Sequence, residues 1–389
     1  MATLNLKTAL VGSLAAAALM AGSPASALTI NLIDIGGVTG SQAQVGFNVA
    51  ARYWESVLTN NATVNLNVGY SALGPGVLGS TSSSLLESVT ISSYEGALAA
   101  TQTSTLDATA VAHLAPLSGG AVNVLVPGYD TPGLGIDDDA ALRVAPSAPI
   151  SKTIALTTAN AKAFGVNFGN IIDGQVQFSN TFAFDFNPTN GISAGQYDFI
   201  GVAVHEIGHA LGFISGADDF DYSDGYTGPV DNIWWGYGLD MFRYSAPGQL
   251  NWAPGVDSYF SIDGGATAYQ NGLFSTGTNF GDGNQASHWK EPNQASPCTN
   301  FRGIMNPYIC GGTGDSVSGL DLAAFDAIGW NLAAGARDNT SYAFTTAQMF
   351  QQFATTGVPE PSAWALMIMG FGLVGAMVRR RGRALAATA

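Results

Sequence analysis

The chain is organised around the stretch Val204-His205-Glu206-Ile207-Gly208-His209-Ala210-Leu211-Gly212-Phe213. Residues four apart on an α-helix share one face, so His205 and His209 can direct two imidazoles at one metal ion. Glu206 then lies beside the open coordination position, where it can take a proton from water. The stretch therefore predicts a helix that carries two metal ligands and a general base.

The flanking residues predict where this helix begins and ends. Asp198 is a suitable N-cap, so we expect a helix from Phe199 to Leu211. Gly212 can end it, because glycine adopts the left-handed backbone conformation at little cost. The motif is thus correctly placed for a metal-binding helix.

The N-terminal residues 1–27 have the form of a secretory signal peptide. An apolar run from Ala9 to Met20 precedes Ala25-Ser26-Ala27, a small-x-small cleavage pattern. We expect a signal peptidase to cleave after Ala27 during export.

The C-terminal residues 358–385 carry a second targeting pattern. Val358-Pro359-Glu360-Pro361 is followed by an apolar segment from Ala363 to Val378 and then by the basic cluster 379–383. This arrangement resembles the PEP-CTERM sorting signal of Gram-negative bacteria. The resemblance implies handling by an exosortase, transient attachment to the inner membrane through this segment alone, and a final location at the cell surface, in the extracellular matrix or in the medium. A permanent single-span anchor is the alternative.

The charge balance excludes nucleic acid and anionic lipid as partners. The chain has 13 basic and 28 acidic residues, a formal net charge of -15. The two targeting segments hold five of the basic residues and only Glu360 of the acids, which leaves the middle of the chain near −19. Such a surface repels polyanions.

The middle of the chain predicts a mixture of helices and strands. Hydrophobic spacing indicates strands at 30–35, 63–70, 175–178 and 181–186, with the last two adjacent, and helices at 44–58, 93–101 and 157–164. The rest of 71–120 gives a weak signal and is interpreted as an insertion. We also expect Asp137-Asp138-Asp139 to precede a helix at 140–143, because acids are favoured at a helix start.

A catalytic zinc site needs a third protein ligand besides His205 and His209. The chain has four histidines, of which His113 lies in no ligand-like pattern and His288 remains. Glutamate is disfavoured, because none occurs between Glu206 and Glu291. His288 is therefore the strongest candidate. Three carboxylates are the alternatives, although we expect them in a Gly/Asp-rich loop that faces solvent or binds calcium: Asp218, Asp219 and Asp221.

The surroundings of His288 add a family resemblance. Ser287-His288-Trp289-Lys290 is followed by Gly303-Ile304-Met305-Asn306-Pro307 and by an apolar segment, 321–330, that ends in Trp330. Together with the 204–213 motif, this resembles the metzincin zinc proteases, and among them leishmanolysin, in which a long insertion precedes the third histidine. Metzincins commonly have that histidine where Ser215 stands.

The resemblance implies an α+β fold with a metzincin-like catalytic domain. An N-terminal subdomain, 28–213, would hold a twisted mixed sheet and the active-site helix. A loop-rich C-terminal subdomain, 214–335, would hold the third ligand and the Met-turn, and a linker, 336–357, would lead to the sorting signal. By the same resemblance His205, His209 and His288 are zinc ligands, Glu206 is the general base, Met305 is the Met-turn residue, and one of the strands 175–178 and 181–186 lies above the cleft.

Several further sites are weaker. Cys298 and Cys310 predict a disulfide, because an even pair in an exported protein is most simply oxidised. Calcium is the second metal considered, at 219–225, although the spacing excludes an EF-hand. A metal site at 137–139 is a further possibility. Tyr308 is a candidate for oxyanion support. A group of aromatic residues is favoured as core over a substrate-binding face: Trp234, Trp235, Tyr237, Trp252 and Tyr259.

The expected function is that of an exported zinc endopeptidase, which hydrolyses protein or peptide substrates with Glu206 as general base. The alternative is a non-catalytic envelope or biofilm-matrix protein on a protease-like scaffold. The intact Glu206 favours the enzyme.

Overall fold

The computed structural model describes residues 28–291 and 301–354. The signal peptide, Cys298 and the sorting segment lie outside the described residues. Within them the chain is a mixture of helices and several small sheets, as the α+β prediction requires.

The first sheet has four strands in the order β1-β2-β8-β3. Strands β1 (Thr29–Gly36), β2 (Thr63–Ser71) and β8 (Gly174–Ser179) run parallel, whereas β3 (Gly79–Ser83) pairs antiparallel with β8 at the edge. The three parallel strands fulfil the predictions at 30–35, 63–70 and 175–178.

Two helices pack together against this sheet: α1 (Gln42–Val57) and α6 (Phe199–Ala210). The rings of Phe47 and Phe199 are 5.1 Å apart, and both contact Phe178 of β8. Gly46 allows this approach, because a Cβ atom there would lie 2.2 Å from the Phe199 ring. The core therefore holds α6 in place from its first residue.

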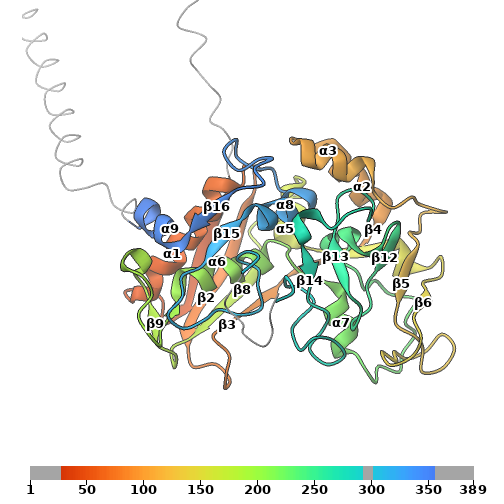
Figure 1. The fold of residues 1–389 in the computed structure, drawn as a ribbon, viewed down its shortest axis with the longest axis horizontal. Helices are drawn as coiled ribbons and strands as arrows, with labels where there is room; N and C mark the ends of the chain where they lie inside the picture. The colour runs from red at the N-terminus through yellow and green to blue at the C-terminus, as the bar shows by residue number, and fades with distance from the viewer. Residues whose placement is uncertain (1–27, 292–300, 355–389) are drawn as a thin grey trace, which may run out of the picture.

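A second sheet of six strands lies on the other side of the molecule (Figure 1), in the order β14-β13-β11-β12-β5-β6. Its strands are β5 (Val124–Val126), β6 (Arg143–Val144), β11 (Arg243–Ala246), β12 (Gln249–Asn251), β13 (Ser258–Phe260) and β14 (Leu273–Phe274). Since β5 and β6 precede α6 in sequence, the sheet joins both halves of the chain. A boundary at residue 213 does not separate the two sheets.

The remaining elements are short and surround these sheets. The helices are α2 (Ile91–Thr101), α3 (Thr105–Ala112), α4 (Pro149–Lys152), α5 (Thr158–Ala163), α7 (Gly216–Tyr222), α8 (Gly319–Ala327) and α9 (Thr346–Phe353), with single turns η1 (Pro188–Asn190), η2 (Gly238–Phe242) and η3 (Tyr269–Asn271). The paired strands are β4 (Leu85–Thr90) with β7 (Thr153–Thr157), β9 (Phe184–Asp185) with β10 (Tyr197–Asp198), and β15 (Ser316–Ser318) with β16 (Ala343–Thr345).

Two predictions in the first half of the chain were wrong. The helix predicted at 93–101 is confirmed as α2, but the rest of 71–120, interpreted as an insertion, supplies β3 and β4 to the sheets and forms α3. Strand β3 has no hydrophobic alternation, because it is a half-exposed edge built from small polar residues. No helix follows Asp137, since its carboxylate accepts the N–H groups of Asp139 and Ala140 and closes a turn.

Two later predictions were also wrong. The expected strand at 181–186 shrinks to β9, which pairs with β10 in front of α6 and not with β8. The expected linker, 336–357, instead contains β16 and α9, and α9 begins with a capping box between Thr345 and Gln348. Met349 of α9 is fully buried, and the helix packs on α1.

Candidate metal centre

Helix α6 begins and ends as its sequence predicts. The Asp198 carboxylate accepts the N–H groups of Ile200 and Gly201 at 3.0 and 3.1 Å, which satisfies two of the free donors at the helix start. Gly212 follows the last turn with φ of 119°, a value that other residues rarely adopt. The helix is thus fixed at both ends of the motif.

The structure brings His205, His209 and His288 together. Their Nε2 atoms are separated by 3.0 Å between His205 and His209, and by 3.2 Å from each of these to His288. Within the described residues, these three form the one group of His, Cys, Asp or Glu side chains with metal-ligand spacing. The third side chain comes from a loop 79 residues beyond His209.

Each imidazole is oriented by a backbone carbonyl at its other nitrogen. The Nδ1 atoms of His205 and His209 donate to the carbonyl oxygens of Ile304 and Phe213, both at 2.7 Å, and that of His288 donates to Gln285 at 3.2 Å. A carbonyl oxygen only accepts, so the proton of each neutral ring resides on Nδ1. All three Nε2 atoms then present lone pairs to the same point.

Burial keeps these rings neutral. It lowers the pKa of His205 to about 4, and burial together with the neighbouring His205 lowers the pKa of His209 to about 3. The pKa of His288 is also held well below its ordinary value, first by burial and then by the two other imidazoles. Three unprotonated nitrogens facing one another repel, and a shared cation removes that repulsion.

The spacing fits a tetrahedral zinc ion. Zinc–nitrogen distances of ~2.0–2.1 Å imply ligand–ligand distances of about 3.3 Å. The observed separations of 3.0–3.2 Å are close to this value. The donor set, three neutral imidazoles, also suits zinc.

Glu206 lies beside the three histidines and is held from the edge strand β3. The Thr81 hydroxyl donates to Glu206 Oε2 at 2.7 Å and to the Glu206 backbone carbonyl at 2.9 Å. Gly79 makes room for the carboxylate, since a Cβ atom there would lie 3.0 Å from Oε1. Burial raises the pKa of Glu206 to about 7, and the Thr81 hydrogen bond opposes the shift.

The buried Asp321 carboxylate orders the chain on the far side of the histidines. Its oxygens accept the N–H groups of Ile304 and Met305, at 2.9 and 3.2 Å, and the indole N–H of Trp289 at 2.8 Å. Gly303 is required here, because a Cβ atom would lie 2.0 Å from the carboxylate. Asp321 therefore links the carbonyl that orients His205 to the residue that follows His288.

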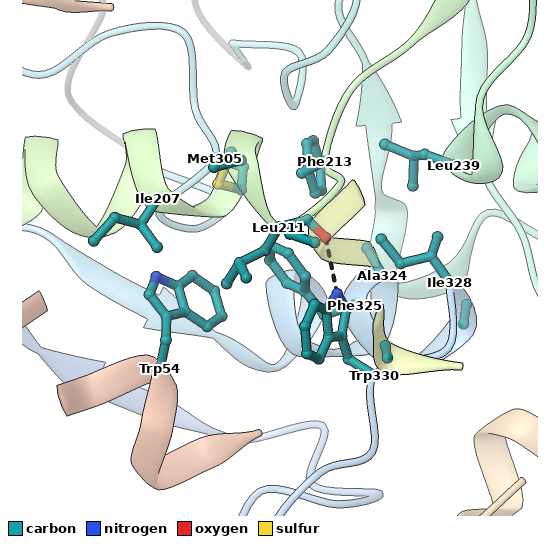
Figure 2. Close-up of a cluster of buried hydrophobic side chains, with 14 of the residues drawn as sticks. Trp54, Ile207, Leu211, Phe213, Leu239, Met305, Ala324, Phe325, Ile328 and Trp330 are labelled. Atoms are coloured by element: carbon teal, nitrogen blue, oxygen red, sulfur yellow. Dashed lines mark hydrogen bonds between the residues drawn. The ribbon is translucent and has the colours of Figure 1, made fainter. Parts of the chain in front are cut away.

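Met305 lies fully buried against α6, in the hydrophobic cluster that also holds Ile207 and Phe213 (Figure 2). Its sulfur would be 2.7 Å from a Cβ atom built on Gly208, one residue before His209. The segment that carries Met305 thus packs against α6 at the residue before His209. A role as a family Met-turn stays a prediction.

Gly208→Ala is expected to destabilise the protein by ~1–3 kcal/mol, because the added methyl group overpacks against Met305. Helical propensity alone would make the same change stabilising by ~0.5–1 kcal/mol. Gly96→Ala in α2 is the matched control, since a Cβ atom there meets nothing within 4 Å. Urea unfolding of both variants should give free-energy changes of opposite sign.

The aspartates considered as alternative ligands lie in helix α7 rather than in a solvent loop. The Asp218 carboxylate accepts the N–H groups of Ala286 and Ser287, directly before His288, at 2.5 and 3.0 Å. Asp221 likewise accepts the N–H groups of residues 278–280. These carboxylates position the loop that carries the third histidine, a role that no local sequence pattern indicated.

The centre opens into a cavity of about 650 Å³. Residues of β3 and the preceding loop line one wall, and the segment after Met305, with Pro307 and Tyr308, lines another. The wall strand is therefore β3, and not one of the strands at 175–178 and 181–186. Tyr308 is exposed at the cavity, and its role in oxyanion support stays a prediction.

His113 and Cys310 are not among the described residues that line the cavity. His113 is exposed and its Nδ1 contacts the Thr109 carbonyl. Cys310 is not a free thiol, but Cys298 lies outside the described residues and the disulfide stays a prediction. Of the aromatic group, Trp235 and Trp252 are buried in the core as favoured, whereas Tyr237 is buried but also lines the cavity.

Calcium binding also stays a prediction. The turn at 137–139 lies near Asp221 and Asp224, and burial together with these charges raises the pKa of Asp138 to about 7. No trio of carboxylates in the described residues has ligand spacing.

The comparison with known families identifies the C-terminal segment. Residues 357–381 match the PEP-CTERM protein-sorting motif. No curated protein and no solved structure matches the chain. Among the described helices, none combines the length and the apolar character that crossing a bilayer demands. The matched motif marks an exported protein that an exosortase processes and that is anchored at the cell surface.

Proposed function

We propose that this protein is a zinc-dependent endopeptidase of the cell surface. One observation carries the proposal: three neutral imidazoles converge at their Nε2 atoms, and the carboxylate of Glu206 lies beside them in an open cavity. Three protein ligands and an open position distinguish catalytic zinc sites from structural ones, which have four.

His205, His209 and His288 would hold the ion, and a zinc ion bound there supplies Lewis acidity towards water and a peptide carbonyl. Glu206 takes the proton from the attacking water and returns it to the leaving amine. Thr81 fixes the direction of this carboxylate through its hydrogen bond to Oε2. The Asp218 and Asp321 carboxylates hold the loop and the turn that orient the histidines.

Strand β3 can bind an extended substrate. Within the described residues it pairs only with β8, so its second edge keeps free N–H and C=O groups beside the cavity. Such an edge can add a peptide as a further strand. Main-chain pairing holds a polypeptide with little regard to sequence, as an endopeptidase requires.

The arrangement supports placing the chain near the metzincins, and among them leishmanolysin. The third histidine follows a long insertion, a buried methionine lies against the helix, and α8 closes the segment before Trp330. These features match the resemblance in the sequence, and the family assignment is part of the proposal.

Casein cleavage by the purified full-length chain tests the function. We expect cleavage that stops when 1,10-phenanthroline removes the metal and returns when zinc is added back, because Glu206 alone does not polarise the amide. A zinc-loaded chain that leaves casein and a peptide library intact would favour the matrix protein.

A further inference from the structure

Helices α3 and α8 pack together at a group of acidic side chains that is separate from the metal centre. Asp107 lies in the first turn of α3, Asp326 lies near the end of α8, and Asp338 lies in the loop that follows. Each raises the pKa of another member of the group through its charge. None of the three lines the cavity of the metal centre, so the zinc site does not account for them.

Asp326 is the most deeply buried of the three, and one of its oxygens has no partner. The residue is 0% exposed. Its Oδ2 accepts the Ser104 hydroxyl at 2.6 Å, whereas Oδ1 is buried without a hydrogen-bond partner in the described part of the chain. A buried carboxylate oxygen in this state is costly unless a ligand or an ion completes it.

Asp107 lies next to Asp326, on the other side of Ser104. The Ser104 oxygen that donates to Asp326 also accepts the N–H of Asp107 at 2.8 Å. Asp107 is 7% exposed, and its Oδ2 accepts the N–H of Thr103 at 3.0 Å. Asp107 acts on Asp326 through its charge and not through a hydrogen bond, so the two carboxyl groups do not share a proton.

The charge of this group is not balanced. Burial, followed by the charge of Asp107, raises the pKa of Asp326 to about 8, and burial also raises the pKa of Asp107. Arg337 opposes the shift of Asp326 only weakly. Its guanidinium donates to the Thr103 carbonyl at 2.9 Å, and within the described residues it forms no ion pair with these acids.

The donor set suits a hard divalent cation. The side-chain atoms that contact Asp326 and Asp107 are oxygens, and calcium takes six to eight oxygen ligands, water among them, at ~2.3–2.6 Å in flexible geometry. Zinc prefers nitrogen and sulfur. The Asp338 oxygens accept the N–H groups at the start of α3, so two carboxylates remain and water completes the shell.

We propose that the carboxylates of Asp326 and Asp107 bind a calcium ion that joins the end of α8 to the start of α3. The ion gives Asp326 Oδ1 its missing partner and offsets the repulsion between the two acids. Helix α8 also carries Asp321, which orders the turn at Met305, so the ion stabilises the scaffold of the metal centre without contacting it. The site goes beyond the proposed peptidase activity and does not depend on it.

The stability of the full-length chain in calcium tests the site. Every sample contains one equivalent of zinc and has the same ionic strength, so calcium acts neither through the three histidines nor by screening. Few protein ligands imply a dissociation constant of ~10⁻⁴–10⁻³ M. Calcium at about 10 mM should then lower the unfolding equilibrium constant about ten- to a hundredfold in urea titrations. Magnesium should act less, because it demands octahedral geometry and gives up water reluctantly.

Two substitutions locate the ion. Asp326→Asn keeps the shape of the side chain and an oxygen for Ser104, but it removes the charge. It should reduce the calcium effect to about twofold or less, and a cooperative urea transition shows that the variant is folded. Asp107→Asn changes the second ligand and should give the same loss, so it decides the matter if Asp326→Asn does not fold.

Asp138→Asn is the matched control, because it makes the same substitution in the acidic turn at 137–139, whose carboxylate oxygens are also buried without partners. It should keep the full calcium effect. An unsubstituted chain whose unfolding is indifferent to calcium would overturn the inference, as would a calcium effect that survives both Asp326→Asn and Asp107→Asn. Loss of the effect in Asp138→Asn alone would place the ion at the turn and would also overturn it.

Discussion

His288→Ala is expected to abolish zinc retention. The three imidazoles are neutral, their Nε2 atoms are 3.0–3.2 Å apart, and two of them lie on one helix. Removing the third leaves a two-ligand site, and the loss should exceed the ~10–100-fold that follows the loss of an outer-shell partner. Elemental analysis after dialysis should find one zinc per unsubstituted chain and almost none in the variant.

His113→Ala is the matched control, because this fourth histidine is exposed and its Nδ1 atom contacts the Thr109 carbonyl. It should retain zinc fully. Zinc retention by His288→Ala equal to that of the control would show that the third ligand is another group, and the proposed centre would be wrong.

The sequence could predict those residues of the site that lie close together in the chain. His205, Glu206 and His209 lie within one helix, so helical geometry alone brings them together. The cap at Asp198 and the glycine at 212 are equally local, and the structure confirms both. The position of His288 followed from the scarcity of histidines and from the resemblance of its surroundings.

The supporting groups could not be predicted, because their partners are distant in sequence. Thr81 reaches Glu206 across 125 residues, and its strand is a polar edge without hydrophobic alternation. Asp218 reaches Ser287 across 69 residues. Edge pairing and the burial of carboxylates depend on tertiary packing. The aspartate-rich stretch was therefore predicted as a loop facing solvent, although it forms α7.

The dependence on tertiary packing also explains why the strand above the cavity was predicted at 175–178 or 181–186, although β3 lies there. The stretch 181–186 alternates clearly, yet β9 keeps only two residues because it pairs with β10 at the start of α6. Its aromatic residues serve the core instead: the rings of Phe184 and Phe199 are 5.3 Å apart. Alternation reports burial on one face and does not identify the neighbouring strand.

Glu206→Gln should separate metal binding from catalysis. Glutamine keeps the shape of the side chain, and its oxygen can still accept the Thr81 hydrogen bond, so the three histidines should retain zinc. Glutamine cannot take a proton from water, and general acid–base catalysis typically contributes ~10²–10⁴-fold. We therefore expect kcat for casein-derived peptides to fall by ~10²–10⁴ while KM changes little.

Two measurements on the same preparation decide between the possible roles of this carboxylate. If Glu206→Gln lost zinc together with activity, the carboxylate would act by maintaining the centre, and its role as general base would lack support. If it kept both zinc and full activity, no proton would pass through Glu206 and the proposed mechanism would be wrong. Glu87→Gln, which makes the same substitution on the surface, should change neither quantity. Retention of zinc with loss of turnover is the one combination that assigns proton transfer to Glu206, because only this combination removes the base without disturbing the ligands.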